Sequence, residues 1–130
     1  MVLMFHTRRA ISLLIVIGFS LLIAPSAEVG AGAGGETPDR VISVVAERFS
    51  FVPSVIRLKQ GEVVELRIRS LDTNHGFRIR KAGVNVIIPK RGRGDARILF
   101  RAQEKGVFPF DCSKACGAGH TIMRGRIVVK

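Results

Sequence analysis

The sequence predicts an all-β fold, a β-sandwich of short strands that follows an apolar N-terminal segment. Apolar and charged residues alternate along residues 63–69 (VVELRIR), which is the pattern of a strand with one buried face. Glycine, proline and aspartate separate this run from several similar ones, and no amphipathic helical pattern follows the N-terminal segment. Several short strands within about 90 residues are typical of two packed sheets.

The N-terminal segment has the features of an export signal. Arg8 and Arg9 precede an apolar run over residues 11–24, which is shorter than the roughly 20 residues that span a bilayer. Residues 31–33 (Ala-Gly-Ala) offer a small-residue cleavage site. We therefore predict a signal peptide and small-residue leader over residues 1–33 and a periplasmic, extracytoplasmic location. A single membrane anchor formed by residues 11–24 is the alternative.

The rest of the chain divides into a linker and one domain. Glycine and alanine dominate the sequence before Pro38 and carry little pattern, so residues 34–39 are predicted to be a flexible linker. The domain is predicted over residues 40–130. A domain of this size buries well over half of its unfolded surface, so it requires no disulfide.

Each predicted strand in this domain is a short run rich in valine, isoleucine or phenylalanine that ends at a turn-forming residue. Gly61, Asp72, Gly83 and Gly106 are examples of these ends. The predicted strands cover residues 41–46, 54–58, 63–69, 76–79, 84–88, 96–101, 107–110 and 126–129.

Four candidate metal ligands lie close together near the C-terminus. Cys112, Cys116, His120 and Met123 follow the spacing C-x3-C-x3-H-x2-M, and His75 offers a further imidazole upstream. Thiolate, thioether and imidazole donors favour copper over magnesium, calcium or manganese. Two cysteines in an exported chain commonly form a disulfide. A bridge across this spacing, however, closes a very small loop and gives no role to His120 or Met123.

Residues 112–123, together with Asn74-His75-Gly76-Phe77, resemble the binuclear copper A (CuA) centre. This centre occurs in the cupredoxin domains of subunit II of haem–copper oxidases and of nitrous oxide reductase. The runs 56–61, 100–108 and 123–129 are also similar to the strands that flank the centre in that family. The resemblance implies a cupredoxin-like Greek-key β-sandwich, two copper ions, and a redox protein partner within a membrane oxidase or reductase complex.

The resemblance also implies a role for each donor. Cys112 and Cys116 would bridge the two copper ions as thiolates, and His75 and His120 would bind one ion each. Spreading one electron over two equivalent metals would keep bond-length changes small. A rigid sandwich would add to this effect and make electron exchange fast.

Three further positions complete the implied site. Met123 would be a weak axial ligand of one copper, and the backbone carbonyl of Lys114 would approach the other. The family usually has glutamate at the position of Lys114, and a lysine there would favour the reduced, less positive cluster. Asp72 would orient the His75 loop as a hydrogen-bond acceptor, or would only form a turn.

The charge of the chain limits the class of its partners. The formal net charge is +11, which favours acidic proteins or anionic surfaces. Nucleic acid is not expected as a partner, because the basic residues mostly alternate with apolar ones and the chain has no Trp or Tyr to stack on bases. The Trp-containing segment through which cytochrome c electrons enter the oxidase family is also missing.

The predicted function is single-electron transfer through a CuA-type centre, without a small-molecule substrate or enzymatic chemistry of its own. Three alternatives use the same residues. A mononuclear copper protein would leave one cysteine without a role. A Cu(I) carrier that delivers copper to an oxidase would suit the same soft donors. A thiol–disulfide protein would use Cys112 and Cys116 without copper.

Overall fold

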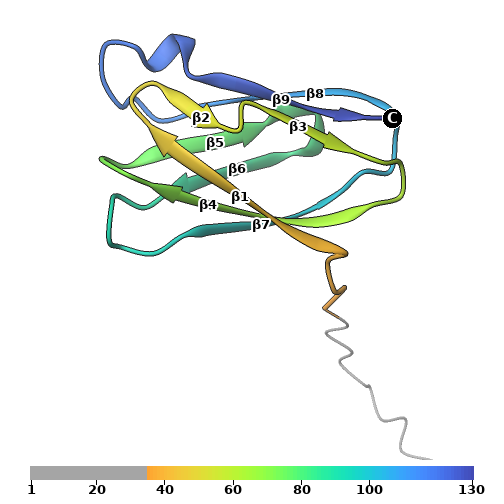
Figure 1. The fold of residues 1–130 in the computed structure, drawn as a ribbon. Helices are drawn as coiled ribbons and strands as arrows, with labels where there is room; N and C mark the ends of the chain where they lie inside the picture. The colour runs from red at the N-terminus through yellow and green to blue at the C-terminus, as the bar shows by residue number, and fades with distance from the viewer. Residues whose placement is uncertain (1–34) are drawn as a thin grey trace, which may run out of the picture. The chain divides into compact units, whose positions relative to one another are not determined.

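The computed structural model describes residues 35–130, which form two packed β-sheets (Figure 1). One sheet has the strand order β2-β1-β4-β7 and the other the order β3-β9-β8-β5-β6. Two short 3₁₀ helices are η1 (Arg80–Ala82) and η2 (His120–Ile122). The strands are β1 (Arg40–Glu47), β2 (Ser50–Val52), β3 (Val55–Leu58), β4 (Val63–Ser70), β5 (His75–Ile79), β6 (Val84–Ile88), β7 (Ala96–Arg101), β8 (Gly106–Asp111) and β9 (Arg124–Val129).

This architecture confirms the predicted all-β sandwich. In β4, the residues Val64, Leu66 and Ile68 are fully buried while the charged residues between them are partly exposed. The strand pairs in parallel with β1 and antiparallel with β7. The alternation in the sequence is therefore the alternation between the interior of the sandwich and solvent.

The observed strands differ from the predicted ones mainly at their ends. β5 begins at His75, one residue before the predicted start, and β9 begins at Arg124. β2 has no counterpart in the sequence prediction, because three residues are too few to show a period. The predicted signal or anchor segment falls in residues 1–34, outside the described residues. Within residues 35–130, no helix has the length and apolar character needed to cross a membrane.

An aromatic cluster in the core joins β2, β5 and β8. Phe51, Phe77 and Phe110 are each at most 1% exposed, and their ring centroids lie 4.9 to 5.5 Å apart. Side chains two residues apart on a strand point to the same face. His75 therefore lies on the same inward face of β5 as Phe77, and Cys112, directly after β8, continues the inward face set by Phe110.

The strands β5 and β8 pair at Arg78 and Asp111, and their side chains form an ion pair in which Arg78 Nη2 lies 2.5 Å from Asp111 Oδ2. This contact brings the start of β5 next to the end of β8. The segments around residues 75 and 112 therefore meet at one end of the sandwich.

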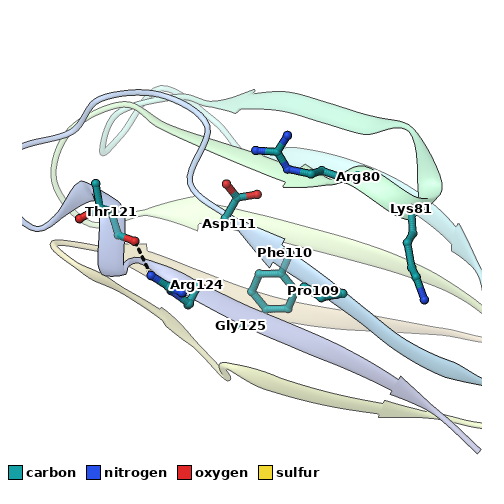
Figure 2. A pocket seen from close by; sticks show the side chains of 8 residues that line it. All are labelled: Arg80, Lys81, Pro109, Phe110, Asp111, Thr121, Arg124 and Gly125. Carbon is teal, nitrogen blue, oxygen red and sulfur yellow. Dashed lines mark hydrogen bonds between the residues drawn. The ribbon is translucent and has the colours of Figure 1, made fainter.

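A groove of about 500 Å³ lies beside η2 (Figure 2). Its apolar lining comes from β8 and β9, and its polar lining includes three exposed basic side chains and the carboxylate of Asp111. Thr121 of η2 is also part of its wall. The lining residues are Arg80, Lys81, Pro109, Phe110, Asp111, Thr121, Arg124 and Gly125.

Gly125 is required where β9 crosses Phe110. A Cβ atom at Gly125 would lie 2.3 Å from Phe110 Cζ and 2.4 Å from the Ser54 carbonyl oxygen. We expect Gly125→Ala to lower the free energy of unfolding by about 1–3 kcal/mol, because Phe110 and the strand must shift to admit the methyl group. Urea unfolding measures this change.

Gly35→Ala is the matched control, because a Cβ atom at Gly35 has no neighbour within 4 Å. We expect it to change the free energy of unfolding by no more than about 0.5 kcal/mol. Equal effects of the two substitutions would contradict the packing at β9.

Candidate metal centre

His75 is fully buried at the start of β5, and its two ring nitrogens have different surroundings. Nε2 lies 2.6 Å from Asp72 Oδ1, whereas Nδ1 is buried without a hydrogen-bond partner. A carboxylate on Nε2 holds the proton there and leaves the Nδ1 lone pair free. A buried nitrogen without a partner lowers the stability of the fold unless it binds a ligand. Nδ1 is therefore suited to bind a metal.

Asp72 is itself held by several hydrogen bonds. Its Oδ2 accepts the backbone N–H of Arg48 at 3.0 Å, and its Oδ1 accepts the Ser70 hydroxyl at 3.2 Å. Burial alone would raise the pKa of the Asp72 carboxyl, but hydrogen bonds from His75, Thr73 and Arg48 outweigh it and hold the pKa below its usual value. Asp72 therefore accepts a hydrogen bond from His75 in addition to forming a turn.

Cys112 lies directly after β8 and is buried. Its Sγ accepts the backbone N–H of Gly76 at 3.4 Å and lies 3.1 Å from the carbonyl oxygen of Lys114. The Sγ of Cys116 is 3.8 Å away, well beyond the roughly 2.05 Å of a disulfide bond. Both thiols are free.

The close approach of the cysteine loop to β5 depends on Gly76. A Cβ atom there would lie 2.2 Å from Ser113 Oγ and 2.7 Å from the backbone nitrogen of Lys114. No larger residue fits without moving the loop. The hydrogen bond from Gly76 to the Cys112 sulfur is therefore available because residue 76 has no side chain.

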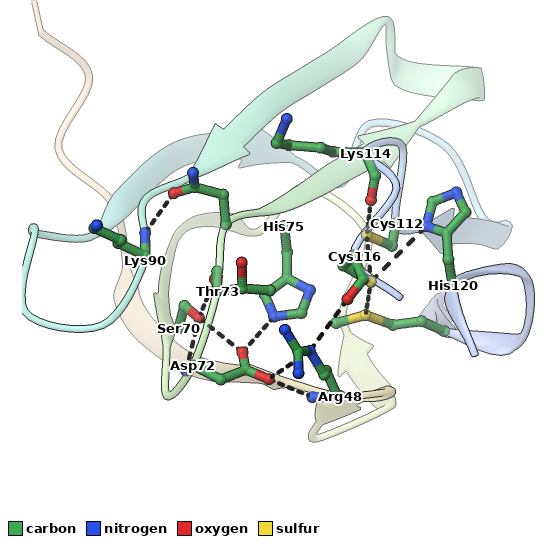
Figure 3. Close-up of polar contacts among 12 residues, drawn as sticks. Arg48, Ser70, Asp72, Thr73, His75, Lys90, Cys112, Lys114, Cys116 and His120 are labelled. Carbon is green, nitrogen blue, oxygen red and sulfur yellow. Dashed lines mark hydrogen bonds and ion pairs between the residues drawn. The ribbon is translucent and has the colours of Figure 1, made fainter. Parts of the chain in front are cut away.

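His120 and Met123 complete the cluster around Cys116. The Cys116 Sγ lies 3.9 Å from His120 Nδ1 and 3.9 Å from Met123 Sδ. Met123 is 1% exposed, whereas His120 is half-buried at the start of η2. His120 is thus the least buried of the side-chain donors, and Figure 3 shows its ring beside the Cys116 sulfur.

The loop between Cys116 and His120 packs against Phe49. Cβ atoms at Gly117 and Gly119 would lie 3.0 Å and 2.2 Å from the Phe49 ring. Gly117 also has a φ of +138°, which favours glycine. Phe49 thereby keeps this segment close to the β1–β2 turn.

The environment of Cys116 keeps its thiol protonated when no metal is bound. Burial, reinforced by the neighbouring Cys112, raises the pKa of Cys116 to about 11. A metal that binds the sulfur must displace this proton.

The structure therefore brings together the residues predicted from the sequence. The metal-binding atoms of His75, Cys112 and Cys116 all lie within 4.8 Å of one another. The Lys114 carbonyl, His120 and Met123 contact one or the other sulfur. Nitrogen and sulfur donors in this arrangement fit copper better than a hard cation.

Two residues at the cluster have no signal in the sequence. Arg48 donates from Nε to the Cys116 carbonyl oxygen at 3.1 Å, and Phe49 lies on the glycines of the cysteine loop. Both belong to the short turn between β1 and β2. No local pattern connects that turn to a loop about 70 residues later, as the separation of 68 residues between Arg48 and Cys116 illustrates.

Relatives of known sequence carry the same domain. Cytochrome c oxidase subunit 2 of Thermus thermophilus is 33% identical over 89 residues, which cover 68% of this chain and 64% of that protein. The nitrous-oxide reductase of Cupriavidus necator is 34% identical over 116 residues, which cover 86% of this chain and 17% of that enzyme. The chain thus spans less than two thirds of the length of either relative.

Solved structures agree with this relationship. A chain of a heme-copper terminal oxidase dimer superimposes with a TM-score of 0.59 at 30% identity, covering 71% of this chain and 65% of the other. The periplasmic domain of subunit II (CoxB) of Bradyrhizobium japonicum has the same fold, with a TM-score of 0.65 at 18% identity and coverage of 72% and 86%.

The family model for the cupredoxin-like domain matches residues 13–129. This match extends over most of the chain and agrees with the observed sandwich and with the relatives above. The chain is a member of the cupredoxin-like domain family, related to subunit II of cytochrome c oxidase and to nitrous-oxide reductase.

Proposed function

We propose that this protein carries single electrons through a binuclear CuA-type copper centre. The observation that carries the proposal is the pair of free thiols, whose sulfurs lie 3.8 Å apart beside the unpartnered Nδ1 of His75. Two sulfurs this close are able to bind two metal ions together. A mononuclear site would leave the second cysteine without a role. Relatives that include oxidase subunits support electron transfer as the purpose of the site.

The proposed ligands follow from these contacts. Cys112 and Cys116 would hold both ions through their thiolates, and His75 Nδ1 and His120 Nδ1 would supply the nitrogen ligands. His75 is the rigid ligand, because Asp72 fixes its ring. His120 is the half-buried ligand, and electrons pass most directly to a partner from its side of the site.

Two weaker ligands complete the proposed set. Met123 Sδ approaches from the Cys116 side, and the Lys114 carbonyl oxygen approaches from the Cys112 side. The Lys114 side chain is exposed and adds a positive charge next to the site, which favours the reduced, less positive state.

When bound, copper supplies a site that gains and loses one electron. The chain contributes burial and rigidity. Packed strands and the Phe51–Phe77–Phe110 cluster leave the ligands little freedom to move when the charge changes. A site that does not rearrange exchanges electrons quickly, and the chain carries out no bond-making chemistry of its own in this proposal.

The soft donors suit a Cu(I) carrier as well, and this remains the second candidate. The buried Met123 thioether and the two thiols are all ligands that select Cu(I). Reversible oxidation and reduction without loss of metal distinguishes the electron carrier from the copper carrier.

We infer that the electron-transfer partner is an acidic protein that docks beside η2 in the extracytoplasmic compartment. The groove there has an apolar lining from Phe110 and Pro109, with Arg80 and Arg124 among its exposed basic residues. Thr121 in its wall directly follows His120 in sequence. A carboxylate-rich segment in this groove therefore lies against the helix that carries His120.

Copper stoichiometry tests the binuclear site directly. We expect the copper-loaded chain to be purple, to hold two copper ions and to give a seven-line EPR signal, because one electron is shared equally between them. Cys112→Ser should reduce the copper content to one ion or none and abolish this signal. Ser113→Ala, in the same loop, is the control and should keep both ions.

A single copper with one intense blue band in the unaltered chain would contradict the binuclear site. Loss of copper on oxidation would instead favour the Cu(I) carrier.

The raised pKa of Cys116 predicts a pH dependence of the copper-free protein. Folding favours the protonated thiol, since burial raises its pKa from an ordinary value near 9 to about 11. This contribution to stability is fully present below pH 9 and is lost as the pH rises towards about 11. Urea unfolding across this range should show a steeper loss of stability in the unaltered chain than in Cys116→Ser. Parallel pH profiles would contradict the burial of this thiol.

A paramagnetic anion tests the docking groove. We expect hexacyanochromate(III) to broaden the NMR signals of residues around Thr121 and Gly125 in the copper-free chain, since Arg80, Lys81 and Arg124 line the groove and the Asp111 carboxylate there is paired with Arg78. Arg80→Glu combined with Arg124→Glu should remove this broadening. The reference site is the second basic hollow, lined by Arg40, Arg57, Lys59, Glu62 and Lys130, where the two substitutions should leave the broadening unchanged. Equal loss of broadening at both hollows, or no broadening beside η2 in the unaltered chain, would contradict docking beside η2.

A further inference from the structure

Arg48 lies in the turn between β1 and β2 and contacts both of the loops that carry the proposed ligands. Its backbone N–H donates to Asp72 Oδ2 at 3.0 Å, and its Nε lies 3.7 Å from the same oxygen. The same Nε donates to the Cys116 carbonyl oxygen at 3.1 Å. One residue thus connects the segment before β5 with the cysteine loop (Figure 3).

These contacts form a continuous path across the centre. Asp72 uses one carboxylate oxygen for His75 Nε2 and the other for Arg48. Arg48 then holds the backbone of Cys116, so the path joins a proposed histidine ligand to a proposed bridging cysteine. The next residue, Phe49, packs on the glycines that follow Cys116.

The exposure of Arg48 indicates what this path does. Its side chain is 54% exposed, and ion pairs at such positions contribute little to the stability of a fold. The geometry is nevertheless specific, because a guanidinium with several fixed donors sits between a carboxylate and a carbonyl. We therefore assign these contacts a role in positioning Asp72 and Cys116 rather than in stabilising the fold.

The positive charge of Arg48 also affects the metal site. The guanidinium offsets the negative charge of Asp72 and so limits how strongly that carboxylate increases the electron donation of His75. It also places a positive charge beside Cys116. Both effects disfavour the oxidised, more positive state of a metal at this site.

We propose that Arg48 is a positioning residue of the metal centre, which holds the Asp72–His75 pair and the Cys116 loop in register and raises the reduction potential. The effect on the potential rests on the proposed electron-transfer function. The effect on the loops does not, because the contacts exist in the chain without metal.

The test compares Arg48→Met with Arg97→Met. Arg97 is an exposed cation on β7, so its substitution removes the same charge away from the site. In the copper-free proteins, we expect amide hydrogen exchange of His120 and Ile122, whose N–H groups donate to the Gly117 and Gly119 carbonyls, to rise about tenfold or more in Arg48→Met only, because the loop loses its anchor. In the copper-loaded proteins, we expect Arg48→Met to lower the potential more than Arg97→Met does.

Arg48→Lys separates charge from geometry. A lysine keeps the positive charge but has no planar group of donors, so we expect it to recover most of the potential and little of the exchange protection. If Arg48→Met and Arg97→Met behave alike in both measurements, Arg48 is an ordinary surface cation and the proposal is overturned. If only the exchange differs and no variant holds copper, the proposed function fails while the positioning role stands.

Discussion

The pairing of β5 with β8 is the contact on which the metal centre depends. It is established at Arg78 and Asp111, whose side chains also pair. Continuing the antiparallel register from this point places Gly76 opposite Ser113, which agrees with the short contacts that a Cβ atom at Gly76 would make. The same register places Cys112 opposite Phe77, so His75, two residues before Phe77, and Cys112 are diagonal neighbours on the inward face. The remaining donors follow because one loop carries them all.

The sequence predicts much of this arrangement and misses what depends on tertiary contacts. Alternation identifies β4 correctly because its inward side chains are all apolar. The donor spacing identifies the cysteine loop because few other sites use two thiols, an imidazole and a thioether so close together. The partner of Asp72 is not determined by the sequence, since a turn aspartate and a hydrogen-bond acceptor look the same. The role of Arg48 cannot be predicted from the sequence for a similar reason. Its position at the centre results from the contact between the β1–β2 turn and a loop 68 residues later.

The thiol chemistry of the chain sets a condition on how a metal enters. The compartment predicted for this protein is oxidising, and two neighbouring cysteines there tend to oxidise. The sulfurs would have to approach by well over 1 Å from their observed 3.8 Å separation to form a disulfide. The buried Cys116 thiol also stays protonated at neutral pH, which slows its oxidation because the thiolate is the reactive form. The scaffold thus holds the two sulfurs apart from disulfide geometry and keeps the Cys116 thiol protonated until a metal displaces its proton.

The base of the donor-bearing loop is closed by one backbone hydrogen bond, from the Cys112 N–H to the Met123 carbonyl oxygen at 3.0 Å. Everything between these residues projects beyond the end of the β8–β9 ladder. A change in the length or composition of this loop would therefore leave the pairing of the two strands intact. The strands that form the frame and the loop that carries the donors are therefore separate parts of the fold. The same sandwich is able to acquire a different metal specificity through a local insertion or deletion, without a new fold having to arise.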